Sequence, residues 1–373
     1  MDYLRYYFSN LLMLAGIAGF ALGGGAVWLG AATFPLVVAL DLLAPHDDLS
    51  VRVVRHPRLA DIPLYLHALL VPVLVATAAY RVHAGGPGGE PLDLTACLGV
   101  ALTLSWLGVI PNIPVAHEPM HRRERFPRFV AFLCTATIAD PLRRLAHLRG
   151  HHAKLGFESD SDTARRGETI YRFMLRAAIA GTREAFESER LRLAKRGASV
   201  WSWRSDVVRS LVLTVTALGL VGGLAGTRAL IVIAAGFGMS RLLLESFNYL
   251  QHYGLVRVPD TRFQRRHSWS HLTPLVRAAA FEITNHAHHH MDPSVRFHAL
   301  IPDADAPRMP SALVCVLAAL IPPIWERWIA MPRLRQWDAH FATDGERVLA
   351  AQANRAARWP VWHPLPQSDR DAS

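Results

Sequence analysis

The sequence is poor in cysteine and in charged residues. It has three cysteines, Cys97, Cys134 and Cys315, and no C-x-x-C pair. These cysteines therefore cannot form a disulfide framework, an iron–sulfur site or a zinc ribbon. Flavin and NAD fingerprints are also missing, because Gly19-x-x-x-Gly23 lacks the required strand–turn–helix context. Only 19% of the residues are charged and 51% are hydrophobic, which directs attention to the apolar stretches.

The hydrophobic residues come in runs near the length of a bilayer crossing, which takes about 20 residues. A signal peptide does not explain the first run, because its opening lacks a clearly basic region and it continues too far. Glycines provide the turns, with Gly23-Gly24-Gly25 in the first hairpin and Gly226-Thr227-Arg228 in the last. The sequence predicts an all-α integral membrane protein with a six-helix bundle, from apolar stretches at 11–29, 34–43, 63–80, 94–113, 207–224 and 229–247.

Positive charge gives the predicted orientation. The net charge is +10, and the segment from His117 to Arg209 is dense in arginine. The positive-inside rule places this segment and the N-terminus in the cytoplasm, in a multi-pass protein that we expect in a bacterial inner membrane. Arginines of this kind suit anionic lipid headgroups. A nucleic-acid partner is not expected, because no nucleic-acid motif accompanies the charge.

The predicted organisation has five parts. Residues 1–112 carry four membrane helices, and 113–206 form a cytoplasmic region with the first histidine groups. A membrane hairpin follows at 207–247, then a second cytoplasmic region at 248–332 and a polar tail at 333–373. The apolar stretch 126–138 is too short to cross and is predicted to be interfacial or buried. Pro322-Pro323 is expected to break the last apolar helix.

Four histidine groups lie on the predicted cytoplasmic side, and three of them have helical spacing. On a helix, residues three and four apart share a face, so these imidazoles can converge. Neutral imidazole is the commonest side-chain metal ligand. The groups provide nine candidate ligands, namely His117, His121, His147, His151, His152, His252, His286, His289 and His290.

Nine imidazoles are too many for one ion and enough for two, since a tetrahedral site takes about four ligands. Nitrogen ligands alone leave iron, zinc, copper and nickel open. The position beneath apolar helices indicates an apolar substrate and oxygen chemistry on C–H bonds. Two other functions remain to be distinguished. His117-Glu118-x-x-His121 fits a membrane zinc protease, although Pro119 interrupts the motif and the other histidines stay unexplained. A non-enzymatic metal or haem carrier is the other.

The segment from Leu107 to Met331 resembles the integral-membrane alkane 1-monooxygenases and the xylene and cymene methyl-hydroxylases, and more distantly membrane fatty acid desaturases. The matching motifs are His117-Glu118-x-x-His121-Arg122, His147-x-x-Gly150-His151-His152, Asn248-Tyr249-x-x-His252-Tyr253-Gly254-Leu255, Asp162-x-Ala164-x-x-Gly167-Glu168, Arg265-Arg266-His267-Ser268-Trp269, Pro310-Ser311 and the last histidine group. The resemblance implies a cytoplasmic non-heme di-iron centre with the nine histidines as ligands. It also implies hydroxylation of a methyl group of an alkane or alkyl-aromatic hydrocarbon with O2.

The resemblance implies further roles. Asp162 and Glu168 are expected to hold ligand imidazoles by their other N–H groups, with ion pairs to Arg165 or Arg166 as the alternative. Glu282 and His288 are expected beside the ligands. Departures at Ala146, Gln251, Asn285 and His288 favour the alkyl-aromatic branch.

Electrons are expected from a rubredoxin or ferredoxin-type donor with its NAD(P)H reductase, which would dock on the arginine-rich surface. A fatty acyl desaturase or hydroxylase of the same superfamily is the alternative activity.

Overall fold

The fold is that of a computed structural model, and the residues it describes are 2–44, 47–151, 154–157 and 159–363. The regular secondary structure of these residues is helical, and an isolated bridge between Ser270 and Arg308 is their one β-type pairing. The predicted all-α class is therefore confirmed. The helices are η1 (Asp2–Tyr6), α1 (Tyr7–Leu22), η2 (Gly24–Trp28), α2 (Leu29–Leu43), α3 (Pro57–Ala84), α4 (Leu94–Val109), α5 (Asn112–Met120), α6 (Arg125–Ala136), α7 (Arg143–Leu145), η3 (Ala146–His151), α9 (Ile170–Ala194), α10 (Asp206–His252), η4 (Arg265–His267), α11 (Pro274–Ala279), α12 (His286–Met291), η5 (Phe297–Ala299), α13 (Ala312–Ala319), α14 (Pro322–Ile324), η6 (Trp325–Ala330), α15 (Met331–His340) and α16 (Asp344–Ala356).

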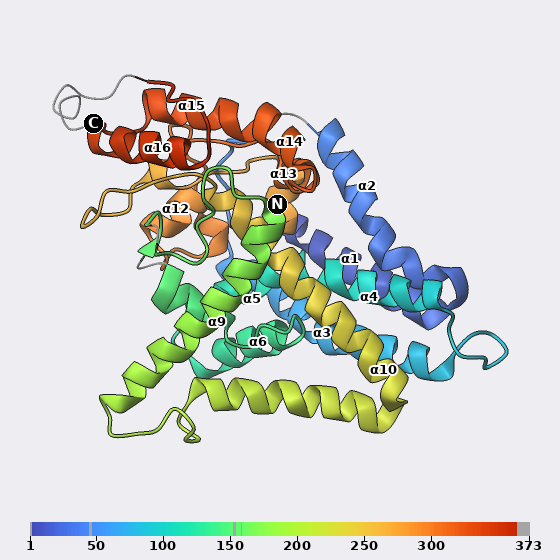
Figure 1. The fold of residues 1–373 in the computed structure, drawn as a ribbon. Coiled ribbons are helices and arrows are strands. Elements are labelled where there is room, and N and C mark those ends of the chain that lie inside the picture. Colours follow the sequence, from blue (N-terminus) through green and yellow to red (C-terminus); the bar gives the residue numbers. More distant parts are fainter. Residues whose placement is uncertain (1, 45–46, 152–153, 158, 364–373) are drawn as a thin grey trace.

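Four helical stretches in the described residues are long and apolar enough to cross a membrane. They are Gly24–Leu43, Pro57–Ala84, Leu94–Met120 and Asp206–His252. The last has 47 residues and contains non-helical backbone at Gly226 (φ 85°, ψ 170°), so α10 consists of two arms. Figure 1 shows these arms folding back as a hairpin. Glycine adopts this positive φ without the steric cost that a side chain would add. The turn predicted at Gly226 is confirmed.

The first hairpin turns at Gly23, which has φ 75° and ends α1. The first turn therefore begins at the predicted glycines Gly23-Gly24-Gly25, inside the apolar stretch 11–29. Helix α1 has 16 residues and begins directly after η1. This length is somewhat short of the about 20 residues that span a bilayer unaided.

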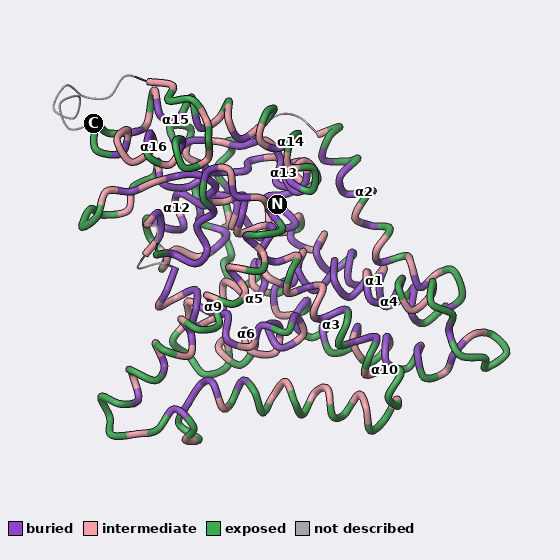
Figure 2. The backbone as a smooth tube through the Cα atoms, viewed as in Figure 1, coloured by how far each residue is buried: buried purple, intermediate pink, exposed green. Residues whose placement is uncertain are grey.

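The first arm of α10 is mostly exposed or half-buried, as Figure 2 shows, and its exposed residues are largely apolar. Apolar side chains at this density on an exposed face suit lipid rather than water. The exposed residues on this arm include Leu211, Val212, Val215, Leu220 and Leu224. The second arm packs against α4, where the Ser240 hydroxyl donates to the carbonyl oxygen of Leu104 at 3.2 Å, and leads to His252 at the helix end.

The C-terminal third of the chain forms a lobe at one end of the long helices (Figure 1). Helix α13 ends at Ala319 and α14 begins at Pro322, so Pro322-Pro323 breaks the helix as predicted. Arg166 ties this lobe to the rest through Asp338 at 2.6 Å and Asn354 at 2.8 Å. The lobe places α12, which carries the last histidine group, against the ends of α5 and α10.

Candidate metal centre

The histidines form two clusters in which ring nitrogens lie within 4.8 Å of one another. The first histidine cluster takes residues from α5, η3 and α12, and the second takes residues from η3, α10 and α12. The first consists of His117, His121, His147 and His289, and the second of His151, His252, His286 and His290. Eight of the nine predicted ligands are thus brought together. His152 lies outside the described residues.

Two of the histidine groups seen in the sequence are divided between the clusters. His147 and His151 are four residues apart on a π-helix, whose turn is wider than that of an α-helix, and they enter different clusters. On α12, His286 and His290 join the second cluster whereas His289 joins the first. Each of these two short helices therefore supplies both clusters and holds them side by side.

Nε2 atoms point inward in both clusters. The Nε2 atoms of His117 and His147 are 2.9 Å apart, and those of His286 and His290 are 3.0 Å apart. In the second cluster His252 Nε2 lies 3.1 Å from His286 Nε2. Converging imidazole nitrogens in a buried setting form a donor set that suits a transition-metal ion.

The Nδ1 atoms of the second cluster face protein acceptors. His151 Nδ1 lies 3.0 Å from Asp160 Oδ2, and His252 Nδ1 lies 3.2 Å from the carbonyl oxygen of His267. An Nδ1–H that donates to such a partner fixes the tautomer and leaves the Nε2 lone pair for a metal. The residues present therefore fit metal ions at both clusters.

Asp160, which the sequence analysis did not name, holds the imidazole of His151, a role of the kind expected for Asp162 and Glu168. Its carboxylate also accepts the Thr163 hydroxyl at 2.7 Å and the Asp162 backbone N–H at 3.1 Å. Burial by itself lowers the pKa of His151, but the Asp160 carboxylate outweighs it and raises the pKa above its ordinary value. Asp160 was missed although it lies two positions before Asp162, because both acids belong to one short polar run.

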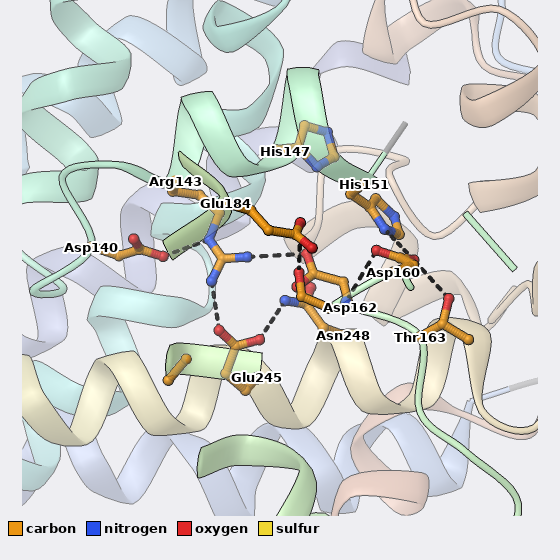
Figure 3. A network of polar contacts seen from close by, with 12 residues as sticks. Asp140, Arg143, His147, His151, Asp160, Asp162, Thr163, Glu184, Glu245 and Asn248 are labelled. Atoms are coloured by element: carbon orange, nitrogen blue, oxygen red, sulfur yellow. Dashed lines mark hydrogen bonds and ion pairs between the residues drawn. The ribbon is translucent and has the colours of Figure 1, made fainter. Parts of the chain in front are cut away.

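Asp162 lies in a buried ion network, which Figure 3 shows. Arg143 contacts Asp140 at 2.5 Å, Glu245 at 2.7 Å and Asp162 at 3.3 Å. Glu245 in turn accepts the Asn248 side-chain amide at 2.7 Å. Burial raises the pKa of Asp162 to about 6. The network joins the segment before η3 to α10, and so fixes the π-helix relative to His252.

Glu282 is fully buried between two guanidinium groups, those of Arg52 at 2.8 Å and Arg277 at 2.6 Å. It also accepts the Asn285 side-chain amide at 3.1 Å, and Asn285 is the residue before α12. Glu282 itself has φ 58°, a left-handed conformation that costs free energy in a non-glycine residue. Glu282 therefore fixes the loop that starts the last histidine group.

Two other predicted residues, Glu168 and His288, pair with groups outside the two clusters. Glu168 forms a bidentate pair with Arg176, with both nitrogen–oxygen distances at 2.8 Å, where the sequence analysis had considered Arg165 or Arg166. His288 Nδ1 accepts the backbone N–H of Ile301 at 2.8 Å, on the opposite side of α12 from the clusters. Burial, with the guanidinium groups of Arg122 and Arg144, lowers the pKa of His121 to about 4, which favours the neutral ligand form.

Glu118 is positioned differently from the general base of a zinc protease. Its carboxylate accepts the backbone N–H of Phe297 at 3.1 Å and pairs with Arg122. Both oxygens are thus engaged by the protein. Since His117 and His121 are joined by His147 and His289, the motif forms half of a larger ligand set and not a separate protease site.

An apolar cavity of about 90 Å³ opens onto both clusters. Histidines from each cluster reach its wall, among them His117 and His286. Most of the remaining wall is apolar and comes from α4, α5, α10 and α11, for example Val109, Ile113, Leu244, Phe247 and Val276. Such a wall binds an apolar molecule and excludes water from the space before the metals.

This combination is that of a helical protein with stretches apolar enough to cross a membrane, two histidine clusters that could hold metal ions, and an apolar cavity beside them. Residues 94–310 match the model of the fatty acid desaturase family. The chain is 42% identical to the xylene/toluene monooxygenase hydroxylase component XylM of Pseudomonas putida, over 97% of each chain. It is 27% identical to alkane 1-monooxygenase 1 of Alcanivorax borkumensis over 84% of this chain and 80% of the relative. A similar match, 27% over 83% and 77%, is to an alkane 1-monooxygenase of Ectopseudomonas oleovorans.

The chain therefore belongs to the fatty acid desaturase family, in the branch of the xylene monooxygenase hydroxylases and alkane 1-monooxygenases. The predicted resemblance is confirmed. Identity to the xylene/toluene relative exceeds identity to the two alkane relatives, in the direction that the altered histidine motifs indicated.

Proposed function

We propose that this protein is a membrane monooxygenase that hydroxylates a methyl group of an apolar hydrocarbon, with an alkyl-aromatic methyl group as its preferred target. The observation that carries the proposal is the apolar cavity that opens onto both histidine clusters. In the reaction one atom of O2 is inserted into a methyl C–H bond. The other atom takes up two electrons and two protons and leaves as water. The names of the xylene/toluene and alkane relatives support this reaction class.

The eight clustered histidines would hold two non-heme iron ions, four imidazoles to each. When bound and reduced, the irons supply the activation of O2. Imidazole ligands suit iron but do not exclude other transition metals. The choice of iron therefore draws on the family, and metal analysis of the purified protein tests it.

The protein chain itself holds the substrate, excludes water from the cavity and fixes the ligand imidazoles. The side chains of Leu244, Phe247 and Val276 hold an apolar substrate in the cavity, and close packing around them keeps water out. Asp160 and the His267 carbonyl fix the rings of His151 and His252, so the ligand nitrogens need little rearrangement during the reaction.

The electrons come from a separate carrier, a rubredoxin or ferredoxin-type protein with its NAD(P)H reductase. The sequence supports this proposal because its cysteines form no C-x-x-C pair and it has no nucleotide fingerprint. The net charge of +10 would attract an acidic donor.

We further propose six crossings in a bacterial inner membrane, with the histidine clusters on the cytoplasmic side. Helices α1, α2 and α3, the α4–α5 pair and the two arms of α10 would be the crossings. Gly88→Cys, in the exposed turn after α3, should react with an impermeant maleimide applied from the periplasmic side. Ser199→Cys, before α10, should react only after lysis; the reverse pattern would refute this orientation.

The activity is tested by feeding. Cells that express the protein with a compatible electron donor receive octane and p-xylene together, and the products are identified by mass. Mostly 4-methylbenzyl alcohol is the expected result, and mostly 1-octanol would move the preference to alkanes. If membranes that contain the metal-loaded protein make neither alcohol, the hydrocarbon proposal fails, and a fatty acyl substrate becomes the candidate, with a double bond or a hydroxyl as the product to seek.

A further inference from the structure

Two residues in the wall of the apolar cavity each have a side-chain polar atom with no hydrogen-bond partner in the described part of the chain. These atoms are His271 Nε2 and the Thr284 hydroxyl oxygen, both buried. Both residues belong to the cavity wall, together with His117, His147 and His286 of the clusters. Buried polar atoms in proteins are nearly always hydrogen-bonded, so an unpaired pair on two residues of the cavity wall requires an explanation.

The two residues are held next to each other by the backbone. The backbone N–H of His271 donates to the carbonyl oxygen of Thr284 at 3.2 Å. Thr284 is two residues before His286, so its position is also set by the start of α12. Their unpaired atoms therefore belong to one rigid part of the cavity wall.

The other ring nitrogen of His271 determines what its Nε2 can do. Nδ1 lies 2.7 Å from the carbonyl oxygen of Pro310 and donates its hydrogen to it. Burial lowers the pKa of His271 to about 4, so the ring is neutral at neutral pH. A neutral imidazole with hydrogen on Nδ1 has an acceptor at Nε2. A hydroxyl group both donates and accepts, so the Thr284 hydroxyl can complement it.

We propose that His271 and Thr284 form a hydroxyl-binding subsite in the otherwise apolar cavity, which takes an alcohol or phenol hydroxyl of the bound molecule. The hydroxyl donates to His271 Nε2 and exchanges a hydrogen bond with the Thr284 hydroxyl. A pure hydrocarbon offers neither bond, so the pair favours ligands that carry a hydroxyl. This inference rests on the proposed hydroxylation and makes both residues determinants of its specificity.

The hydroxyl has two possible sources. It can be a ring substituent of a substrate such as 4-methylphenol, which keeps a methyl group to hydroxylate. It can also be the new hydroxyl of a product such as 4-methylbenzyl alcohol. Both present the same hydrogen-bonding group, and the two arms of the experiment below separate them.

The experiment uses two substitutions, each with a matched control. His271→Asn retains a donor for the Pro310 carbonyl but removes the acceptor at the Nε2 position, whereas His271→Gln places an amide oxygen near that position. Thr284→Val removes the hydroxyl at constant shape, and Thr284→Ser keeps it. All variants are measured in membranes with the full chain and its electron donor.

In the first arm, kcat/KM for 4-methylphenol is divided by kcat/KM for p-xylene. We expect His271→Asn and Thr284→Val each to lower this ratio about tenfold, equivalent to about 1.4 kcal/mol. The Gln and Ser variants should restore most of it. In the second arm, 4-methylbenzyl alcohol competes with p-xylene, and its inhibition constant should rise about tenfold in the Asn and Val variants.

A change in either arm identifies the source of the hydroxyl and supports the subsite. Unchanged values in both arms, or equal losses in the Gln and Ser controls, would overturn it. Binding gives a readout that does not depend on turnover: the phenol should raise the melting temperature of the purified metal-loaded wild type more than p-xylene does. The Asn variant should lose that difference. Wild-type protein without p-xylene turnover would instead refute the proposed function, and the melting shifts would still test the subsite.

Discussion

Each of the two histidine clusters contains four histidines, but the surrounding protein holds the two sets differently. In the second histidine cluster all four residues are buried, and Nδ1 atoms donate to Asp160 and to the His267 carbonyl. In the first histidine cluster His117 and His121 are partly exposed; His117 lies in α5 and His121 directly follows this short helix. We infer that the second cluster is the more rigid and less accessible of the two metal sites.

Loss of a ligand should produce the largest effect in either cluster. His289→Ala and His252→Ala should each abolish hydroxylation and lower the iron content, because each removes one of four clustered nitrogens. His289→Ala is expected to leave about one iron per chain, retained in the second cluster. Metal analysis of purified protein and product analysis of membranes measure both quantities.

A control on the same turn of α12 makes this result specific. His288→Ala should keep its iron, since His288 accepts a backbone N–H from Ile301 and faces away from the clusters. It should cost only about 1 kcal/mol of stability. Iron loss in His288→Ala equal to that in His289→Ala would show that the turn as a whole, and not the ligand, had been damaged.

The rate at which a chelator removes iron should distinguish the two clusters, with the next largest effect. A hydrophilic chelator should take the first iron from the first histidine cluster, because His117 and His121 are the partly exposed ligands. Iron release should therefore have two phases of about equal size. A fast phase that survives in His289→Ala would contradict the assignment.

The support of the second cluster is tested by Asp160→Asn. The change keeps the size of the side chain and removes the charge that pairs with His151 Nδ1 at 3.0 Å. Loss of such a partner lowers metal affinity or activity by about 10–100-fold. Competition with a chelator of known affinity measures the loss, and Glu187→Gln, on the exposed side of α9, is the matched control.

The smallest effect should come from Glu346, which reaches the second cluster only through His267. Its carboxylate lies 2.6 Å from His267 Nε2, and the carbonyl of His267 accepts from His252. Although burial alone would raise it, hydrogen bonds from His267 and Arg266 lower the pKa of Glu346 to about 2. Glu346→Gln should cost about 1–3 kcal/mol of stability and reduce activity a few-fold.

The pH dependence of this pair has a defined sign. A carboxylate with a lowered pKa stabilises the fold fully above its ordinary value of 4.5 and loses that contribution as the pH falls toward 2. Wild-type protein and Glu346→Gln should therefore differ in melting temperature at pH 7 and converge toward pH 2. A difference that persists at pH 2 would show that the stabilisation is not ionic.

Much of the fold followed from local patterns. Long apolar runs predicted the helices, Gly226 predicted the turn inside α10, and Pro322-Pro323 predicted the break after α13. These features depend on residue type and short spacing, which a sequence displays directly. Gly23-Gly24-Gly25 likewise predicted the first turn, although the helix before it ends at Leu22, inside the apolar stretch 11–29.

The sequence by itself showed that imidazoles supply the site's candidate metal ligands, since histidines three and four residues apart can converge from one helix. Only the tertiary structure decided their partition, because a π-helix at 146–151 and the short helix α12 each divide their histidines between two clusters. The tertiary structure also decided which charged side chains pair, since Glu346 contacts His267 and Arg52 contacts Glu282 although each pair is far apart in sequence. Contacts of that range depend on the packing of whole helices, which no local spacing encodes.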